Sequence, residues 1–211
     1  MNVLAGLVLK KMALFRLFGV LDRMILFLVV FCMIVALGFS LASAWSDFRT
    51  MTIPNIYIIG IGVSFLPAFL LDLFAVPGGP VLFSSWLSHL VAAGLVFLVT
   101  ILFFAARIIG AGDSKMCAAL ALWAGLGGLA PFLFYMALTG AVLALATKLM
   151  AKKQLFRQAP EGSWIAKAQA GGAGVPYGIA LFIGAIVAFY QLGYFAPEKL
   201  ALLAGYTEIS G

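Results

Sequence analysis

Long apolar runs separated by short polar connections divide the chain from residue 25 onward. Crossing the hydrocarbon core of a bilayer as an α-helix takes roughly 20 mostly apolar residues. By that measure the runs predict six spans, at residues 25–44, 56–74, 86–106, 116–129, 131–149 and 175–195. The fold class that we predict is an all-α membrane protein, a polytopic bundle of about six transmembrane helices.

The first 24 residues follow a different pattern, in which apolar patches alternate with charged side chains. This pattern is typical of a helix that lies on the membrane surface rather than one that crosses it. We therefore divide the chain into an amphipathic interfacial segment at residues 1–24 and a six-helix transmembrane domain at residues 25–211. The same charges argue against a cleavable signal peptide, because they interrupt its apolar core. They are Lys10, Lys11, Arg16, Asp22 and Arg23.

Composition supports a membrane protein and excludes several other classes. The chain is 65% hydrophobic and 9% charged, whereas a soluble domain carries about 25% charged residues. Its net charge of +6 does not indicate nucleic-acid binding, because the basic residues fall between apolar runs, where they orient a polytopic protein. Cys32 and Cys117 form no CxxC pair, and a single histidine cannot make an H-E-x-x-H site. We expect no metal and no cofactor.

Two acids, Asp47 and Asp113, follow the first and third predicted spans. Since two spans separate them, both lie on the same side of the membrane. Carboxylates near membrane depth are rare and are functional candidates by default. Two of them within hydrogen-bond reach share a proton, so one can act as a base toward water and the other as an acid toward a peptide carbonyl. The sequence therefore indicates an aspartic peptidase pair.

Other interpretations of these acids remain open. Asp113 could cap the fourth helix, and Asp47 could form a local pair with Arg49. A rival from another class is a transporter or channel subunit in which both acids line an ion path, although no internal repeat supports it. Replacing either Asp by Asn separates the classes, because only a protease should lose cleavage while still inserting.

Basic residues suggest how the protein is inserted. The connections after the first, third and fifth spans carry eight of them and the other side carries five. Basic loops face the cytoplasm, so the count places both acids on the cytoplasmic side. The basic N-terminal segment favours the opposite orientation.

Three motifs resemble those of the type IV prepilin peptidases, a family of intramembrane aspartyl proteases. Residues 110–113 match the G-x-G-D signature, residues 47–55 resemble the first-aspartate motif, and residues 175–178 resemble the motif that begins the last helix. Presenilin and signal peptide peptidase share G-x-G-D but add Pro-Ala-Leu, which does not occur here. The absence of CxxC motifs makes the chain similar to the short members, as in tight-adherence (Flp-type) pilus systems or the archaeal preflagellin peptidases, and puts N-methylation of the product in doubt.

The resemblance implies an aspartic endopeptidase that removes the short basic leader of prepilins or pseudopilins at the cytoplasmic face of the bacterial inner membrane. Asp47 and Asp113 would be its catalytic pair. Partners would be the substrate's leader and apolar helix and the lipid bilayer, with no nucleic acid; self-association is left open. Residues expected to support the site or to bind substrate are Gly110, Gly112, Arg49, Pro54, Asn55, Lys115, Pro176, Tyr177 and Gly178.

Three smaller expectations concern parts of the chain around the acids. Gly110 and Gly112 remove side-chain bulk, which would let a substrate strand pass close to Asp113. His89, the single histidine, is expected at the membrane interface, far from the acids. The hydrophilic connection at residues 151–174 is either a flap that admits substrate or a solvated connector.

Overall fold

The computed structural model describes the backbone of residues 2–75, 79–153, 161, 163–171 and 174–205, and the side chains of all of these but residues 2–18 and 153. Within these ranges all regular structure is helical, which confirms the predicted all-α membrane protein. Four of the described helices are long and apolar enough to cross a membrane, and α6 is a shorter apolar helix. The helices are α1 (Asn2–Thr50), α2 (Asn55–Ala75), α3 (Trp86–Ala105), α4 (Ala111–Lys153), α5 (Trp164–Gln169), α6 (Tyr177–Gln191) and α7 (Pro197–Leu203).

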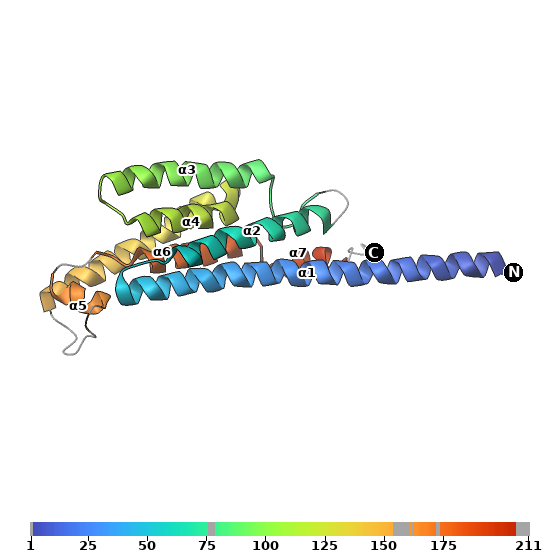
Figure 1. The fold of residues 1–211 in the computed structure, drawn as a ribbon, viewed down its shortest axis with the longest axis horizontal. Helices are drawn as coiled ribbons and strands as arrows, with labels where there is room; N and C mark the ends of the chain where they lie inside the picture. The colour runs from blue at the N-terminus through green and yellow to red at the C-terminus, as the bar shows by residue number, and fades with distance from the viewer. Residues whose placement is uncertain (1, 76–78, 154–160, 162, 172–173, 206–211) are drawn as a thin grey trace.

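Helix α4 folds back on itself. In a straight helix, 19 residues would separate Cys117 and Met136 by about 28 Å, yet their sulfur atoms lie 4.0 Å apart. The reversal occurs at Gly125, whose φ of 60° and ψ of −178° are not helical. The two antiparallel halves, residues 111–124 and 126–153, correspond to the predicted fourth and fifth spans (Figure 1). With the two halves of α4 counted separately, the described residues form six helical segments that are longer than α5 and α7.

Helix α1 is longer than predicted at both ends. It continues from Asn2 to Thr50 without a break, which corresponds to about 73 Å at 1.5 Å per residue. Its N-terminal part extends beyond the rest of the bundle (Figure 1). At the other end it passes the predicted limit at residue 44 and places Asp47 in its last turn. The position of residues 1–24 on a membrane surface stays a prediction.

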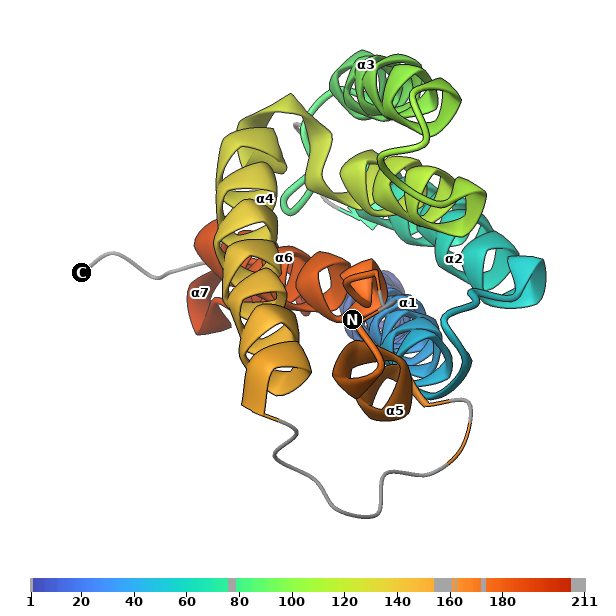
Figure 2. The same ribbon diagram turned by 90° about the vertical axis from the view of Figure 1, so that its left-hand side faces the viewer.

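Helix α6 lies in the middle of the bundle, between α1 and the second half of α4 (Figure 2). The close approach to α4 depends on Gly184. A Cβ atom at Gly184 would lie 2.7 Å from the carbonyl oxygen of Phe132 and 3.0 Å from the amide nitrogen of Met136. Helix α3, by contrast, packs mainly on α4 and lies at the periphery (Figure 2).

An aromatic cluster fills the end of the bundle opposite the acids. The Trp123 indole donates a hydrogen bond to the Ile61 carbonyl at 2.8 Å, and the Tyr194 hydroxyl donates to the Trp123 carbonyl at 2.7 Å. His89 belongs to this cluster and is 1% exposed, so the expectation of an interface residue is wrong. The rings in contact are those of Phe65, Phe69, Phe83, His89, Trp123, Phe189 and Tyr194.

Part of the predicted connection at residues 151–174 is an anchored helix. Ser163 caps α5 by accepting a hydrogen bond from the Ala166 amide at 3.3 Å. Trp164 is 5% exposed and its ring lies 5.8 Å from that of Phe48 in α1. A connector that is solvated throughout is therefore wrong for these residues. Residues 154–160 lie outside the described part.

The tight contact at Gly184 predicts that a larger side chain there destabilises the protein. Gly184→Ala should lower the unfolding midpoint in detergent, because overpacking a close helix contact costs about 1–3 kcal/mol. Gly94→Ala in α3 is the matched control, since a Cβ at Gly94 meets nothing within 4 Å. Equal midpoints for the two variants would contradict the packing described.

Candidate active site

Asp47 caps another helix from a distance. Its side chain is 5% exposed, and its Oδ2 accepts a hydrogen bond of 2.8 Å from the Gly178 amide in the first turn of α6. Amide groups at a helix N-terminus lack partners within the helix and favour negative charge. Gly178 is required for this approach, because a Cβ there would lie 3.0 Å from the Asp47 Cβ and 3.2 Å from the Ala44 Cα.

Asp113 occupies the first turn of α4, which begins at Ala111 rather than at the predicted residue 116. The first helical bond runs from the Ser114 amide to the Gly110 carbonyl at 3.2 Å. The Asp113 Oδ2 reaches back to the Gly110 amide at 3.1 Å, as the third residue of a capping box does. A capping role for Asp113 therefore holds, and the residues predicted as a connection are largely helix.

The two acids lie at the same rim of the bundle. Asp47 is close enough to Asp113 to act on it electrostatically. The start of α4 is also joined to the connection that follows α1, because the Lys115 Nζ donates a hydrogen bond to the Asn55 Oδ1 at 3.2 Å. A Cβ at Gly112 would lie 3.1 Å from the Ile53 Cβ. Gly112 thus permits a close contact with Ile53 within the protein, and passage of a substrate strand beside Asp113 stays a prediction.

The other predicted residues surround this rim with different contacts. Arg49 is exposed and lies over the Trp45 ring, 5.8 Å from its centre. Among the described residues Arg49 forms no ion pair with Asp47, so the local pair considered from the sequence is absent. Pro54 directly precedes α2, and its carbonyl accepts from the Tyr57 amide at 3.2 Å. Pro176 is buried and forms the N-cap of α6.

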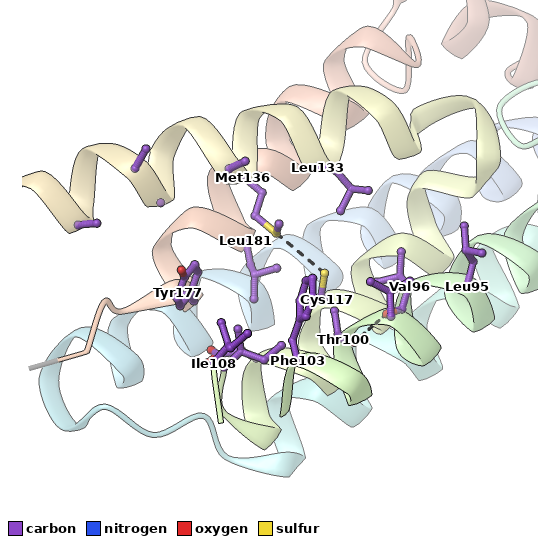
Figure 3. Close-up of a pocket in the computed structure, with 17 residues that line it drawn as sticks. Leu95, Val96, Thr100, Phe103, Ile108, Cys117, Leu133, Met136, Tyr177 and Leu181 are labelled. Atoms are coloured by element: carbon purple, nitrogen blue, oxygen red, sulfur yellow. Dashed lines mark hydrogen bonds between the residues drawn. The ribbon is translucent and has the colours of Figure 1, made fainter. Parts of the chain in front are cut away.

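An apolar cavity of about 630 Å³ reaches the rim (Figure 3). It lies between α3, both halves of α4 and the start of α6. Asp113 is the one ionisable carboxyl in its lining, and Tyr177 also lines it. The lining residues are Leu95, Val96, Val99, Thr100, Phe103, Ile108, Ile109, Asp113, Cys117, Leu133, Met136, Ala137, Gly140, Ala141, Ala144, Tyr177 and Leu181.

The sequence analysis missed a third buried acid, Asp72 in α2, which is fully buried. Its carboxyl accepts hydrogen bonds of 2.9–3.1 Å from the backbone amides of Val81, Leu82 and Phe83. An acid inside the predicted span 56–74 was the available signal. Because these amides satisfy it at the end of α2 remote from the paired acids, Asp72 is a structural anchor for the connection to α3.

Possible ligand groups for a metal are sparse. Within the described residues, no three His, Cys, Asp or Glu side chains are grouped so that they could hold an ion. The thiol of Cys117 lines the cavity and lies against Met136, and Cys32 is a free thiol elsewhere in the bundle.

The fold and the site define a multi-pass helical membrane protein with two carboxyl groups at one rim, one of them opening on an apolar cavity. The sequence model of the type IV leader peptidase family matches residues 34–145, just over half of the chain, and the chain belongs to this family. The match confirms the resemblance to the prepilin peptidases, and the protein is a protease with a leader peptidase-like function. Comparison with curated proteins and with solved structures gave no match.

The contact between Gly178 and Asp47 makes a prediction for the peptidase. Gly178→Ala should lower the rate of leader cleavage by about tenfold, because Asp47 must shift by a few tenths of an ångström and a misplacement of about 1 Å can cost about 100-fold. The measurement is cleavage of a prepilin-like reporter in proteoliposomes. Gly38→Ala in α1 is the control, since a Cβ at Gly38 meets nothing within 4 Å. Similar rates for both variants would show that the α1–α6 contact does not position the site.

Proposed function

We propose that the protein is an aspartic endopeptidase that removes the short leader of type IV prepilins or pseudopilins with Asp47, Asp113 and water. The observation that carries the proposal is the shared way in which the two acids are held. Each carboxyl is bound through Oδ2 by a glycine amide, from Gly178 and Gly110 respectively. No other hydrogen bond joins either carboxyl to the described residues, which leaves one oxygen of each for chemistry.

The mechanism follows from the coupling of the two charges. In the proposed dyad the two carboxyls share one proton, because carboxylates close to each other do not both ionise readily. The ionised member takes a proton from water as the water attacks the scissile carbonyl, and the protonated member donates to the carbonyl oxygen. In the second half of the reaction a proton passes to the leaving nitrogen. The glycine amides keep both carboxyls in place throughout.

The lengths of the helices that begin at the acids support cleavage of a peptide bond near the membrane surface. Helix α6 and residues 111–124 both begin at the acids. They extend about 22 Å and 21 Å, less than the hydrocarbon core of about 30 Å. In the proposed arrangement their acid-bearing ends lie at the membrane surface, where water reaches them.

The basic residues favour a cytoplasmic site in a bacterial inner membrane. Six exposed basic side chains surround or lie near the acid-bearing rim, and basic segments remain in the cytoplasm. The substrate class that we assign is the prepilin of a tight-adherence (Flp-type) system, on the resemblance to the short members of the family. The six are Arg49, Arg107, Lys115, Lys148, Lys152 and Lys167.

A transporter or channel subunit is the less favoured function. An ion path needs polar groups along its length, whereas the cavity next to Asp113 is lined almost entirely by apolar side chains. Such a lining suits an apolar polypeptide.

Conservative replacement of each acid tests the proposed dyad. Asp47→Asn and Asp113→Asn should each reduce cleavage at least about 1,000-fold, because the acid and the base act as one unit. Both variants should still insert into the membrane and, after purification in detergent, elute from a size-exclusion column at the same volume as the parent protein. Glu198→Gln, an exposed acid at the start of α7, is the control and should cleave normally. Full cleavage by either Asn variant would refute the dyad.

The assigned orientation can be measured separately. Lys167→Cys at the rim and Glu198→Cys at the other end should react with a membrane-impermeant maleimide from opposite sides. Lys167→Cys should label in inverted inner-membrane vesicles and Glu198→Cys in intact spheroplasts. The parent protein, treated in the same way, gives the background labelling from the free thiols of Cys32 and Cys117. The reverse pattern would place the acids outside the cytoplasm.

A further inference from the structure

The cavity beside Asp113 is a groove with two helical walls that opens sideways. One wall is α3, whose lining residues Leu95, Val99 and Phe103 are 51%, 44% and 47% exposed. The floor is buried and includes Cys117 and Leu181, both below 4% exposure. Figure 3 shows the α3 side chains and those of the second half of α4 pointing toward each other across the groove.

The second wall is the later half of α4, and its length suits a helix. Its lining residues run from residue 133 to residue 144, a rise of about 17 Å, or three helical turns. An apolar helix is the occupant that satisfies all of its own backbone groups in such a place, because the bilayer offers no water to hydrogen-bond.

This wall carries small side chains where the opposite wall carries large ones. Ala137, Ala141 and Ala144 recur at helical spacing along it, whereas Gly140 between them is buried. Small residues let two helix backbones approach closely in a membrane. The carboxyl of Asp113 lines the same cavity as these small residues. A helix packed against them would therefore lie next to the proposed catalytic acid.

Tyr177 limits the groove at the acid-bearing end. Its ring covers Gly140, where a Cβ would lie 3.3 Å from the Tyr177 Cε1. The next residue, Gly178, holds Asp47. A helix in the groove therefore meets the Tyr177 ring beside the two acids, and we expect the substrate chain to leave the helical conformation near this point. An extended chain at that point exposes a peptide bond to water.

We propose that this groove binds the apolar helix of the substrate on the C-terminal side of the scissile bond. Ala137, Ala141 and Ala144 then determine how large the substrate side chains facing α4 can be. The proposal rests on the proposed peptidase function and adds the binding surface and its specificity. A lipid chain has the same polarity as this occupant, and the experiment separates the two.

The first measurement changes the size of the wall. Ala141→Leu should reduce cleavage of a prepilin-like reporter, a short basic leader followed by an apolar helix, by about tenfold or more, because the added atoms overfill the groove. Replacing a large residue of the reporter helix by alanine at the facing position should restore much of the rate. Val142→Leu is the control, since Val142 is 61% exposed and lies outside the groove.

The second measurement detects occupancy without relying on turnover. A photo-crosslinking amino acid in place of Val99, which lines the groove, should capture the reporter helix. The same group in place of Leu98, which is 66% exposed and lies outside the lining, should not. Capture of lipid alone at position 99 would overturn the proposal.

The outcomes separate this proposal from the peptidase itself. Cleavage that depends on Asp47 and Asp113 but is unaffected by Ala141→Leu, with equal crosslinking from positions 98 and 99, overturns the groove and leaves the peptidase standing. Loss of rate that no smaller reporter residue restores, with no crosslink at position 99, overturns it as well. If the parent protein cleaves no reporter, the proposed function has failed, and the crosslink at position 99 still decides whether the groove binds a helix.

Discussion

The hydrogen bond between Gly178 and Asp47 is the contact on which the site depends. It joins residues 131 positions apart and ties the last turn of α1 to the first turn of α6. The acid satisfies an amide that α6 itself leaves free, so the carboxyl that we propose for the chemistry also joins two helices of the bundle. The contact requires glycine at 178, since any side chain would displace Asp47 or the α1 backbone. Asp113 is held in a similar way, by the amide of Gly110.

The two ends of the bundle have different physical characters. At one end an interlocked aromatic cluster and the carboxyl of Asp72 bind the helices to one another. At the other end, the paired acids are held by one amide each, and an apolar groove remains open beside them. Packed aromatic contacts and satisfied polar groups give rigidity. The rigid end can therefore maintain the geometry of helices whose other ends, in the proposed function, admit a polypeptide.

Much of the fold follows from the sequence because the bilayer imposes it. Six apolar runs predicted six spans, and each run corresponds to a helical segment of the described residues, with two of them joined as α4. Four of the helices are long and apolar enough to cross a membrane. The even number of spans between Asp47 and Asp113 required a shared side. The boundaries were less predictable, since capping by Asp113 starts α4 five residues early. Polar character marked residues 45–50 as a connection, but hydroxyl groups such as Thr50 can bond within a helix.

Contacts between distant segments could not be predicted from residue spacing. The resemblance singled out Gly178 and Gly112 as site residues. Only the structure shows that Gly178 makes room for the Asp47 side chain and that Gly112 makes room for the Ile53 side chain. Asp72 is visible in the sequence as an acid inside a predicted span, but its role is not, because its partners are backbone amides, which carry no sequence signal. The groove was hidden for a similar reason. Its two walls belong to helices that appear in the sequence simply as apolar runs.

The central claim is that Asp47 and Asp113 act together on one peptide bond. Binding of a peptide analogue with a hydroxyl group in place of the scissile carbonyl tests it most directly, because such analogues bind about 10² to 10⁸ times more tightly than substrates. The account predicts tight binding to the parent protein and loss of that tightness in both Asp47→Asn and Asp113→Asn. Tight binding that survives either substitution would contradict it.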